Sequence, residues 1–355
     1  MRPVRRPPLV LALACLCLGA AAAEKEAPPG PRPALGLAVN LPPAATTAEQ
    51  NRALAEARRT GVSLFALPVS WSAGEPAPGH YRIADVTRTA RLLRQSGAVL
   101  HLDLPLVAGR ARDVPRDLAA VPFDDSRLSL RLGRFLDTLS PALLDFATVS
   151  LGYQADTYFM DKPEELHAFC RLFDGAVQFL QKRAPHLRAG VTTSAPNESP
   201  AAAVAAALHQ RSPVLFYVYA PFERARPFTH RSPDAIERDW KQLLHGAGGR
   251  PVAFPEVSFS SAEENGSSPA KQAEFVRRLR KFLASADGRR LLFARYVPWR
   301  DPREDEVPAG AGALAVALAR RAFLANRGLQ TAAGAPKPAW REWARAAEAA
   351  RPRGR

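Results

Sequence analysis

The sequence has little cysteine, and beyond its first two dozen residues it has no long apolar run. Only three of its 355 residues are Cys, and two of them, Cys15 and Cys17, lie near the N-terminus, which leaves Cys170 in the rest of the chain. One thiol cannot form an internal disulfide, so the fold must rest on a hydrophobic core, which a chain of this length can build. No later segment has the roughly 18 consecutive apolar residues of a transmembrane helix.

Motifs for metals, nucleotides and activated serine nucleophiles are missing as well. The seven His residues show no H-E-x-x-H spacing, and the chain contains no G-x-S-x-G. The first apolar segment continues as LAVNLPPAATT, without the G-x-G-x-x-G loop of a dinucleotide-binding fold. We therefore predict no cofactor and no metal.

The chain carries a formal charge of +15, with 49 Lys and Arg against 34 Asp and Glu. A basic surface attracts phosphate, but the many Arg and Ala beside few Lys are typical of a GC-rich coding bias, which raises charge without selecting a partner. We therefore expect no nucleic-acid partner. Binding of an anionic polymer, such as an acidic polysaccharide, remains an alternative.

The N-terminal segment has the three parts of a secretory signal. Its basic residues are Arg2, Arg5 and Arg6. The apolar run Leu9–Leu18 and then Ala21–Ala23 follow, as a short hydrophobic region and a small-residue cleavage site do. We predict a signal peptide over 1–23, a Pro-rich spacer over 24–33, and export to the periplasm or medium of a bacterium. A lipoprotein acylated at Cys15 or Cys17 fits less well, because Ala stands three residues before each.

The rest of the chain alternates short apolar segments with amphipathic stretches of helical period. The strand candidates are Leu35–Asn40, Ser63–Val69, Val99–Leu104, Phe146–Leu151, Arg188–Thr192, Val214–Tyr219, Val252–Phe254 and Leu291–Val297. The helix candidates include Thr47–Thr60, Ile83–Ser96, Leu128–Leu139, Pro163–Arg183 and Pro269–Ala286. Eight strands, each followed by a helix, predict an α/β fold of the (β/α)8 TIM-barrel type, with one domain over 34–336 and a basic tail over 337–355.

In such a barrel the functional residues gather where the strands end. The residues there are mainly acidic and aromatic: Trp71, Asp103, Tyr153, Gln154, Asp156, Tyr219, Glu223, Glu256 and Trp299. Carboxylates supply the acid, base and nucleophile of glycosidic cleavage, and aromatic faces stack on sugar rings. Glu256 is the strongest candidate, because in FPEVSF it has no helix immediately after it to cap.

Three segments resemble clan A glycoside hydrolases. The segment from Trp71 to Gly97 has Trp, then Glu-Pro, then Gly-x-Tyr and a helix, as their second strand and helix do. FPEVSFSSAEENGSSPAKQ resembles their seventh strand, and GLQTAAGAPKPAWREW resembles their closing segment. The resemblance implies that Glu256 is the nucleophile of a retaining mechanism and that a Tyr of strand six, here Tyr219, hydrogen-bonds it.

The same resemblance implies Asn-Glu at the end of strand four, with that Glu as general acid/base. Here the segment is LGYQADTYF, so Tyr153-Gln154 stands at that place. Gln cannot donate a proton to a leaving alkoxide, and losing general acid catalysis costs about 10²–10⁴ in rate. Asp156 would replace the acid if the strand continued past Gln154, because it would then face the same side.

Three functions follow as hypotheses. The first is a secreted, glycosidase-like barrel that binds carbohydrate or polysaccharide with impaired or absent hydrolysis. The second is an active retaining glycosidase or transglycosylase with Glu256 as nucleophile and Asp156 as displaced acid. The third is a basic protein that binds an anionic polymer. Catalysis is assigned to Glu256, Gln154 and Asp156, and substrate binding to Trp71, Asp103, Tyr153, Tyr219 and Trp299.

Overall fold

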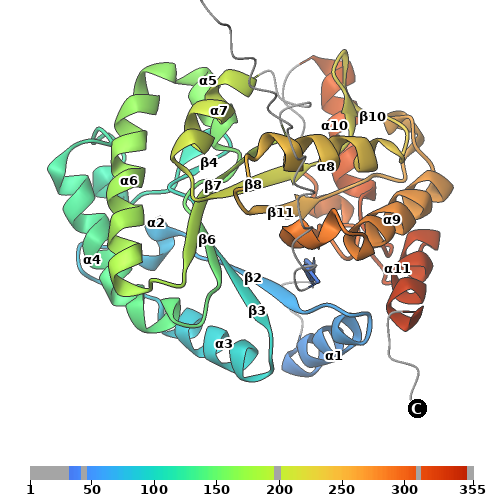
Figure 1. Cartoon of the computed structure of the whole chain (residues 1–355), viewed down its shortest axis with the longest axis horizontal. Coiled ribbons are helices and arrows are strands. Elements are labelled where there is room, and N and C mark those ends of the chain that lie inside the picture. The colour runs from blue at the N-terminus through green and yellow to red at the C-terminus, as the bar shows by residue number, and fades with distance from the viewer. Residues whose placement is uncertain (1–31, 41–45, 196–200, 309–312, 350–355) are drawn as a thin grey trace, which may run out of the picture.

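A computed structural model describes residues 32–40, 46–195, 201–308 and 313–349, and every structural statement below concerns these residues (Figure 1). The predicted signal peptide, with Cys15 and Cys17, lies outside them. So does nearly all of the predicted spacer.

Eight parallel strands close into a barrel, as the sequence predicts. They are β1 (Ala34–Leu37), β2 (Leu64–Pro68), β3 (Val99–Asp103), β6 (Thr148–Ser150), β7 (Arg188–Ser194), β8 (Val214–Tyr219), β11 (Val252–Val257) and β12 (Leu291–Tyr296). Each strand pairs with the next one in this list, and β12 pairs with β1 to close the ring. The predicted (β/α)8 architecture is therefore confirmed.

Helices surround the barrel (Figure 1). They are α1 (Thr47–Arg59), α2 (Trp71–Gly74), α3 (Ala84–Gln95), α4 (Ser126–Leu143), α5 (Ala155–Asp161), α6 (Leu166–Arg183), α7 (Ala202–Arg211), α8 (Ala235–Gly246), α9 (Pro269–Ala284), α10 (Leu314–Asn326) and α11 (Pro338–Ala349). Ser268 begins α9 as the sequence indicates: its side chain accepts from the Lys271 amide, with Pro269 in the first turn.

Two small antiparallel hairpins lie in the loops. One pairs β4 (Val107–Ala108) with β5 (Ala111–Arg112), in the loop after β3. The other pairs β9 (Phe222–Glu223) with β10 (Arg226–His230), in the loop after β8. Both hairpins follow strands at their carboxyl ends, which is the end of the barrel that carries the candidate site.

The barrel interior is filled by an apolar layer. Its buried members are Leu64, Val214, Phe216, Ala253 and Phe293. His101 lies among them, with its ring 5.1 Å from that of Phe216 and 5.0 Å from that of Phe293. Because side chains alternate along a strand, His101 and Asp103 of β3 face the same way, and Asp103 lies one step nearer the carboxyl end.

The range predicted as a basic tail contributes α11 to the outer layer. Trp343 is fully buried, and its indole N–H donates to Thr60 Oγ1 at 2.9 Å. Lys337, just before the helix, forms an ion pair with Asp301 at 2.6 Å. Cys170 is a buried free thiol in α6. None of the described helices has the length and apolar character that a membrane crossing requires.

Candidate carbohydrate site at the barrel mouth

An irregularity in β11 directs Glu256 into the barrel. Ala253 pairs with Phe216 of β8, and Glu256 pairs with Val218. Between these two pairs β11 advances by three residues and β8 by only two. Such an extra residue is a β-bulge, and it reverses which side of the sheet the following side chain faces. Pro255 lies within this irregular stretch and has no N–H to donate to a ladder. Glu256 therefore faces the interior, as Ala253 does.

Both oxygens of the Glu256 carboxylate accept hydrogen bonds. Oε1 accepts from Arg327 at 2.5 Å and from the Ser258 hydroxyl at 3.2 Å. Oε2 accepts from the Tyr153 hydroxyl at 2.5 Å. The side chains of Glu256 and Arg327 are 13% and 19% exposed, so their ion pair is largely removed from solvent. The carboxylate is thus neutralised by one cation and held by two hydroxyls.

Tyr153 reaches Glu256 from the loop that follows β6. The loop is anchored to the β4–β5 hairpin, because the Tyr153 amide donates to Val107 O and the Gly109 amide donates to Tyr153 O, both at 2.9 Å. Burial raises the pKa of Tyr153 well above its ordinary value, and the charge and hydrogen bond of Glu256 raise it further. The phenol is therefore protonated at neutral pH and acts as a donor to Glu256.

Gln154 begins α5 in a left-handed conformation. Its φ and ψ are 46° and 45°, a region that residues other than Gly seldom adopt, and its side chain does not cap the helix. The side chain is partly buried. Of the two neighbours Tyr153 and Gln154, the one bonded to Glu256 is Tyr153.

Asp103 lies in the same site, on β3. Its Oδ1 is 3.0 Å from Nε2 of His101, and its Oδ2 is 3.5 Å from Arg295. Burial alone would raise the pKa of Asp103, but the charge and hydrogen bond of His101 and the charge of Arg295 outweigh it and hold the pKa below its ordinary value. Asp103 is therefore a carboxylate at neutral pH.

Gly36 of β1 makes room for Arg295. A Cβ on Gly36 would lie 2.8 Å from Cβ of Arg295 and 2.7 Å from Leu64, too close for any side chain. Glycine at this place allows an arginine to enter the barrel interior beside Asp103.

The structure places Asp156 away from the expected position. β6 ends at Ser150, so the strand does not continue to Asp156, which lies in the first turn of α5. Its side chain is fully buried, and Oδ1 accepts from the Ser194 amide at the end of β7 at 3.0 Å. The condition under which Asp156 would face the same side as Gln154 is not met.

Tyr219 also has another partner than expected. Its hydroxyl donates to Asp239 of α8 at 3.0 Å, and its ring packs against Trp240 and Phe275 outside the barrel. Tyr153 therefore makes the bond to Glu256 that was expected of Tyr219. Glu223 forms an ion pair with Arg226 in the β9–β10 hairpin.

The two tryptophans expected to bind substrate are fully buried. The Trp71 indole donates to Glu75 at 2.9 Å, and its ring packs on Phe135. The Trp299 ring lies 5.6 Å from the Trp340 ring and 4.7 Å from the Arg300 guanidinium. A sugar would reach either ring only after these neighbours moved.

Sequence reasoning missed Arg327. It follows the last turn of α10, and its guanidinium lies 5.4 Å from the Phe323 ring. Within a chain of 49 Lys and Arg, one more Arg carries no signal of its own. No cluster of three or more His, Cys, Asp or Glu side chains that could hold a metal occurs among the residues with described positions.

Comparisons with known proteins support the architecture. No family model matches the sequence, and no curated protein matches it significantly. Among solved structures, GH5_18 from Streptomyces cattleya in complex with GlcNAc is 15% identical, with a TM-score of 0.69 over 92% of this chain and 83% of that one. The exo-β-1,4-mannosidase Op5Man5 from Opitutaceae bacterium strain TAV5 is 14% identical, with a TM-score of 0.62 over 90% and 61%.

Xylanase 10B from Thermotoga maritima is 12% identical, with a TM-score of 0.60 over 90% of this chain and 95% of that one. Identities this low establish the fold alone. The chain therefore has a clan A glycoside hydrolase-like (β/α)8 fold, the class that the sequence resemblance indicated.

Proposed function

We propose that this protein is an exported barrel that binds a glycan at the carboxyl ends of its strands and lacks acid-assisted hydrolysis. The observation that carries the proposal is the pairing of Glu256 with Arg327 and Tyr153. A retaining pair needs a second carboxyl group about 5–5.5 Å from the nucleophile, protonated when the leaving group departs. The group bonded to Glu256 across the mouth is a phenol.

The carboxyl groups of the mouth do not suit the role of acid. Asp103 has a lowered pKa and is ionised at neutral pH. Asp156 is directed to the Ser194 amide. Tyr153 has a raised pKa and already donates to Glu256, so its proton is not directed to a leaving group.

The same groups suit recognition of sugar hydroxyls. Carboxylates accept, guanidinium groups donate, and hydroxyls do both, which are the bonds that sugar hydroxyls make. The side chains of Glu256, Asp103 and Arg295 keep 13% to 20% of their surface exposed, through which a ligand can reach their charged groups. A ligand that exchanges some of these internal bonds for its own would bind without being cleaved.

The first probe is Manβ1-4GlcNAc, because solved GH5_18 structures of this fold hold that disaccharide. Isothermal titration should show saturable binding to the wild-type protein. Glu256→Gln should weaken binding about tenfold or more, because a hydrogen bond to a charged acceptor is lost. Glu237→Gln, on α8 outside the barrel, is the matched control and should bind as the wild type does.

If Manβ1-4GlcNAc and a wider panel of neutral oligosaccharides fail to bind, the proposal is rejected. Binding only of acidic polysaccharide, unaffected by Glu256→Gln, would favour the anionic-polymer alternative.

A further inference from the structure

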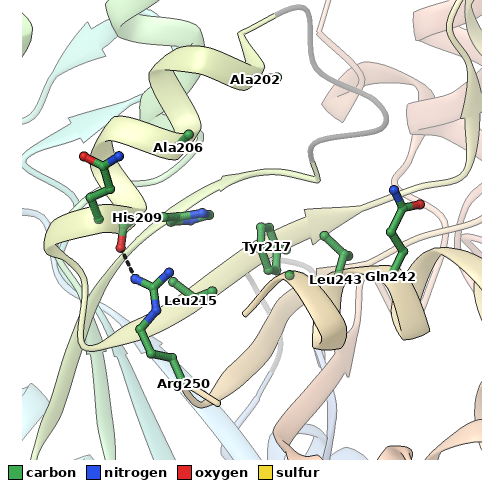
Figure 2. A pocket seen from close by; sticks show the side chains of 10 residues that line it. Ala202, Ala206, His209, Leu215, Tyr217, Gln242, Leu243 and Arg250 are labelled. Carbon is green, nitrogen blue, oxygen red and sulfur yellow. Dashed lines mark hydrogen bonds between the residues drawn. The ribbon is translucent and has the colours of Figure 1, made fainter. Parts of the chain in front are cut away.

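A cavity of about 380 Å³ lies on the outer face of the barrel, between helices α7 and α8 (Figure 2). Its floor is formed by Leu215 and Tyr217 of β8, which face the helices, whereas Phe216 between them belongs to the barrel interior. The cavity is therefore on the opposite side of the sheet from Glu256. Its lining residues are Ala202, Ala206, His209, Gln210, Leu215, Tyr217, Gln242, Leu243, Gly246 and Arg250.

Small residues on the two helices create this cavity. Ala202 and Ala206 of α7 line the cavity on one side (Figure 2). Gly246 of α8 is also part of its lining. Helices on a sheet are about 8–10 Å apart, a distance normally filled by larger side chains. Without them a slot remains between the two helices, with Leu215 and Tyr217 nearly buried at its base, and a volume of this size is within the range of small-molecule sites.

Arg250 supplies the charge of the cavity. Its guanidinium donates to the carbonyl oxygens of His209 and Ala247. Within the described part of the chain no carboxylate forms an ion pair with it, although ion pairs are found for many other Arg residues. Figure 2 shows the guanidinium at one end of the cavity, beside His209 and Leu215.

The other polar groups of the cavity are neutral. Burial and the charge of Arg250 lower the pKa of His209 to about 4, so its imidazole is uncharged at neutral pH. Burial raises the pKa of Tyr217 to about 12, so its hydroxyl is also uncharged at neutral pH. The ring of His209 meets that of Tyr217 edge-on at 4.9 Å.

We propose that this cavity binds a small planar carboxylic acid, with its carboxylate on Arg250 and its ring between α7 and α8. A single uncompensated guanidinium selects one negative charge, and its planar fork matches the geometry of a carboxylate. The apolar slot between the small residues of α7 and α8 selects a flat, aromatic body. The ligand class is therefore an aryl carboxylate, and the site is separate from the glycan site.

The experiment is a titration of the full-length protein with benzoate, followed by calorimetry or ligand-observed NMR. Benzoate should bind saturably below about 10 mM, and benzamide, its neutral isostere, about tenfold more weakly. Ala206→Leu fills the cavity and should weaken benzoate binding at least about tenfold. Ala203→Leu, an exposed position on the same helix outside the cavity, should leave it unchanged.

Arg250→Gln should weaken benzoate binding about tenfold while leaving benzamide binding unchanged. The proposal is overturned if benzoate does not bind saturably, if benzamide binds as well, or if Ala206→Leu and Ala203→Leu behave alike. Glu256→Gln should not alter benzoate binding, so failure here and failure of the glycan proposal are distinguishable.

Discussion

The two halves of the barrel mouth differ in how closely they follow the clan A pattern. The half where β11 ends keeps a Glu, aimed inward by a bulge at Pro255. In the half where β6 ends, Tyr153-Gln154 stands where the resemblance implies Asn-Glu, and the Tyr153 hydroxyl donates to Glu256. Under the proposed function, Glu256 stands in the mouth without a second catalytic carboxyl group, and Arg327, Tyr153 and Ser258 hold its carboxylate.

The largest effect is expected from Arg327→Met, which leaves Glu256 without its counter-ion in a largely buried place. We expect the free energy of unfolding to fall by about 3 kcal/mol. Arg183→Met, which breaks an exposed pair with Asp137, should cost less than about 1 kcal/mol. Denaturant unfolding measures the free energy of unfolding of both variants. Equal decreases would show that the ion pair of Glu256 and Arg327 contributes no more than an exposed pair does.

The double variant Arg327→Met/Glu256→Gln should recover much of the unfolding free energy that Arg327→Met loses, because the second substitution removes the uncompensated charge. A double-mutant cycle over these positions would show a coupling of about 1 kcal/mol or more.

The next effect is expected from Tyr153→Phe, which removes the hydroxyl donor to Glu256 and keeps the ring. A hydrogen bond to a charged group contributes about 2 kcal/mol, and its loss should appear in the same unfolding measurement. Tyr81→Phe is the control, because the Tyr81 hydroxyl has no hydrogen bond within the described residues. If Tyr153→Phe were as stable as its control, the two halves of the mouth would not be coupled.

The free energy of unfolding should also depend on pH through His230, the last residue of β10. Its Nε2 accepts from the amide of Ser260, which follows β11. Burial lowers the pKa of His230 to about 3 from 6.5. Below pH 6.5 the imidazole of His230 takes up a proton in the unfolded chain but not in the folded one. The free energy of unfolding is therefore unaffected by His230 titration above that pH, and it falls as the pH is lowered from 6.5 toward 3.

Each such His adds a slope of about 1.4 kcal/mol per pH unit to the unfolding free energy within that window. His230→Gln should remove that slope between about pH 6 and 4.5, whatever its effect at neutral pH. An unchanged slope would mean that the imidazole is protonated in the folded protein.

The smallest effect is expected from Asp156→Asn in the β6 half. The amide oxygen of Asn still accepts from the Ser194 amide, so the change in unfolding free energy should stay within about 1 kcal/mol. Any turnover should be unaffected. A specific loss of turnover in this variant would restore Asp156 as the displaced acid.

The sequence predicts the fold well because its signals are local and repeated. All eight barrel strands overlap their predicted segments, and the Ser268-Pro269 start of α9 is confirmed. Strands buried on both faces appear as short apolar runs, whatever their neighbours are.

The site is predicted less well because it depends on which side of the sheet each side chain faces and on contacts between residues far apart in the sequence. The bulge at Pro255 sets the side that Glu256 faces, and period-two alternation cannot show it. Tyr219 faces α8 because its side chain is on the outer side of β8. Arg327, which follows α10, contacts Glu256 although the two are 71 residues apart in the sequence. A prediction limited to strand ends could find Tyr153 and Glu256 but not Arg327, which pairs with Glu256.

The most direct measurement is the release of reducing sugar from a panel of unactivated β-linked oligosaccharides, Manβ1-4GlcNAc among them, by the wild-type protein and by Gln154→Glu. The account predicts no glycan hydrolysis above background by the wild type, and detectable release once a carboxyl group is restored after β6. Substantial wild-type hydrolysis that is abolished by Glu256→Gln would contradict it, because the protein would then cleave glycosidic bonds without a carboxyl group at position 154.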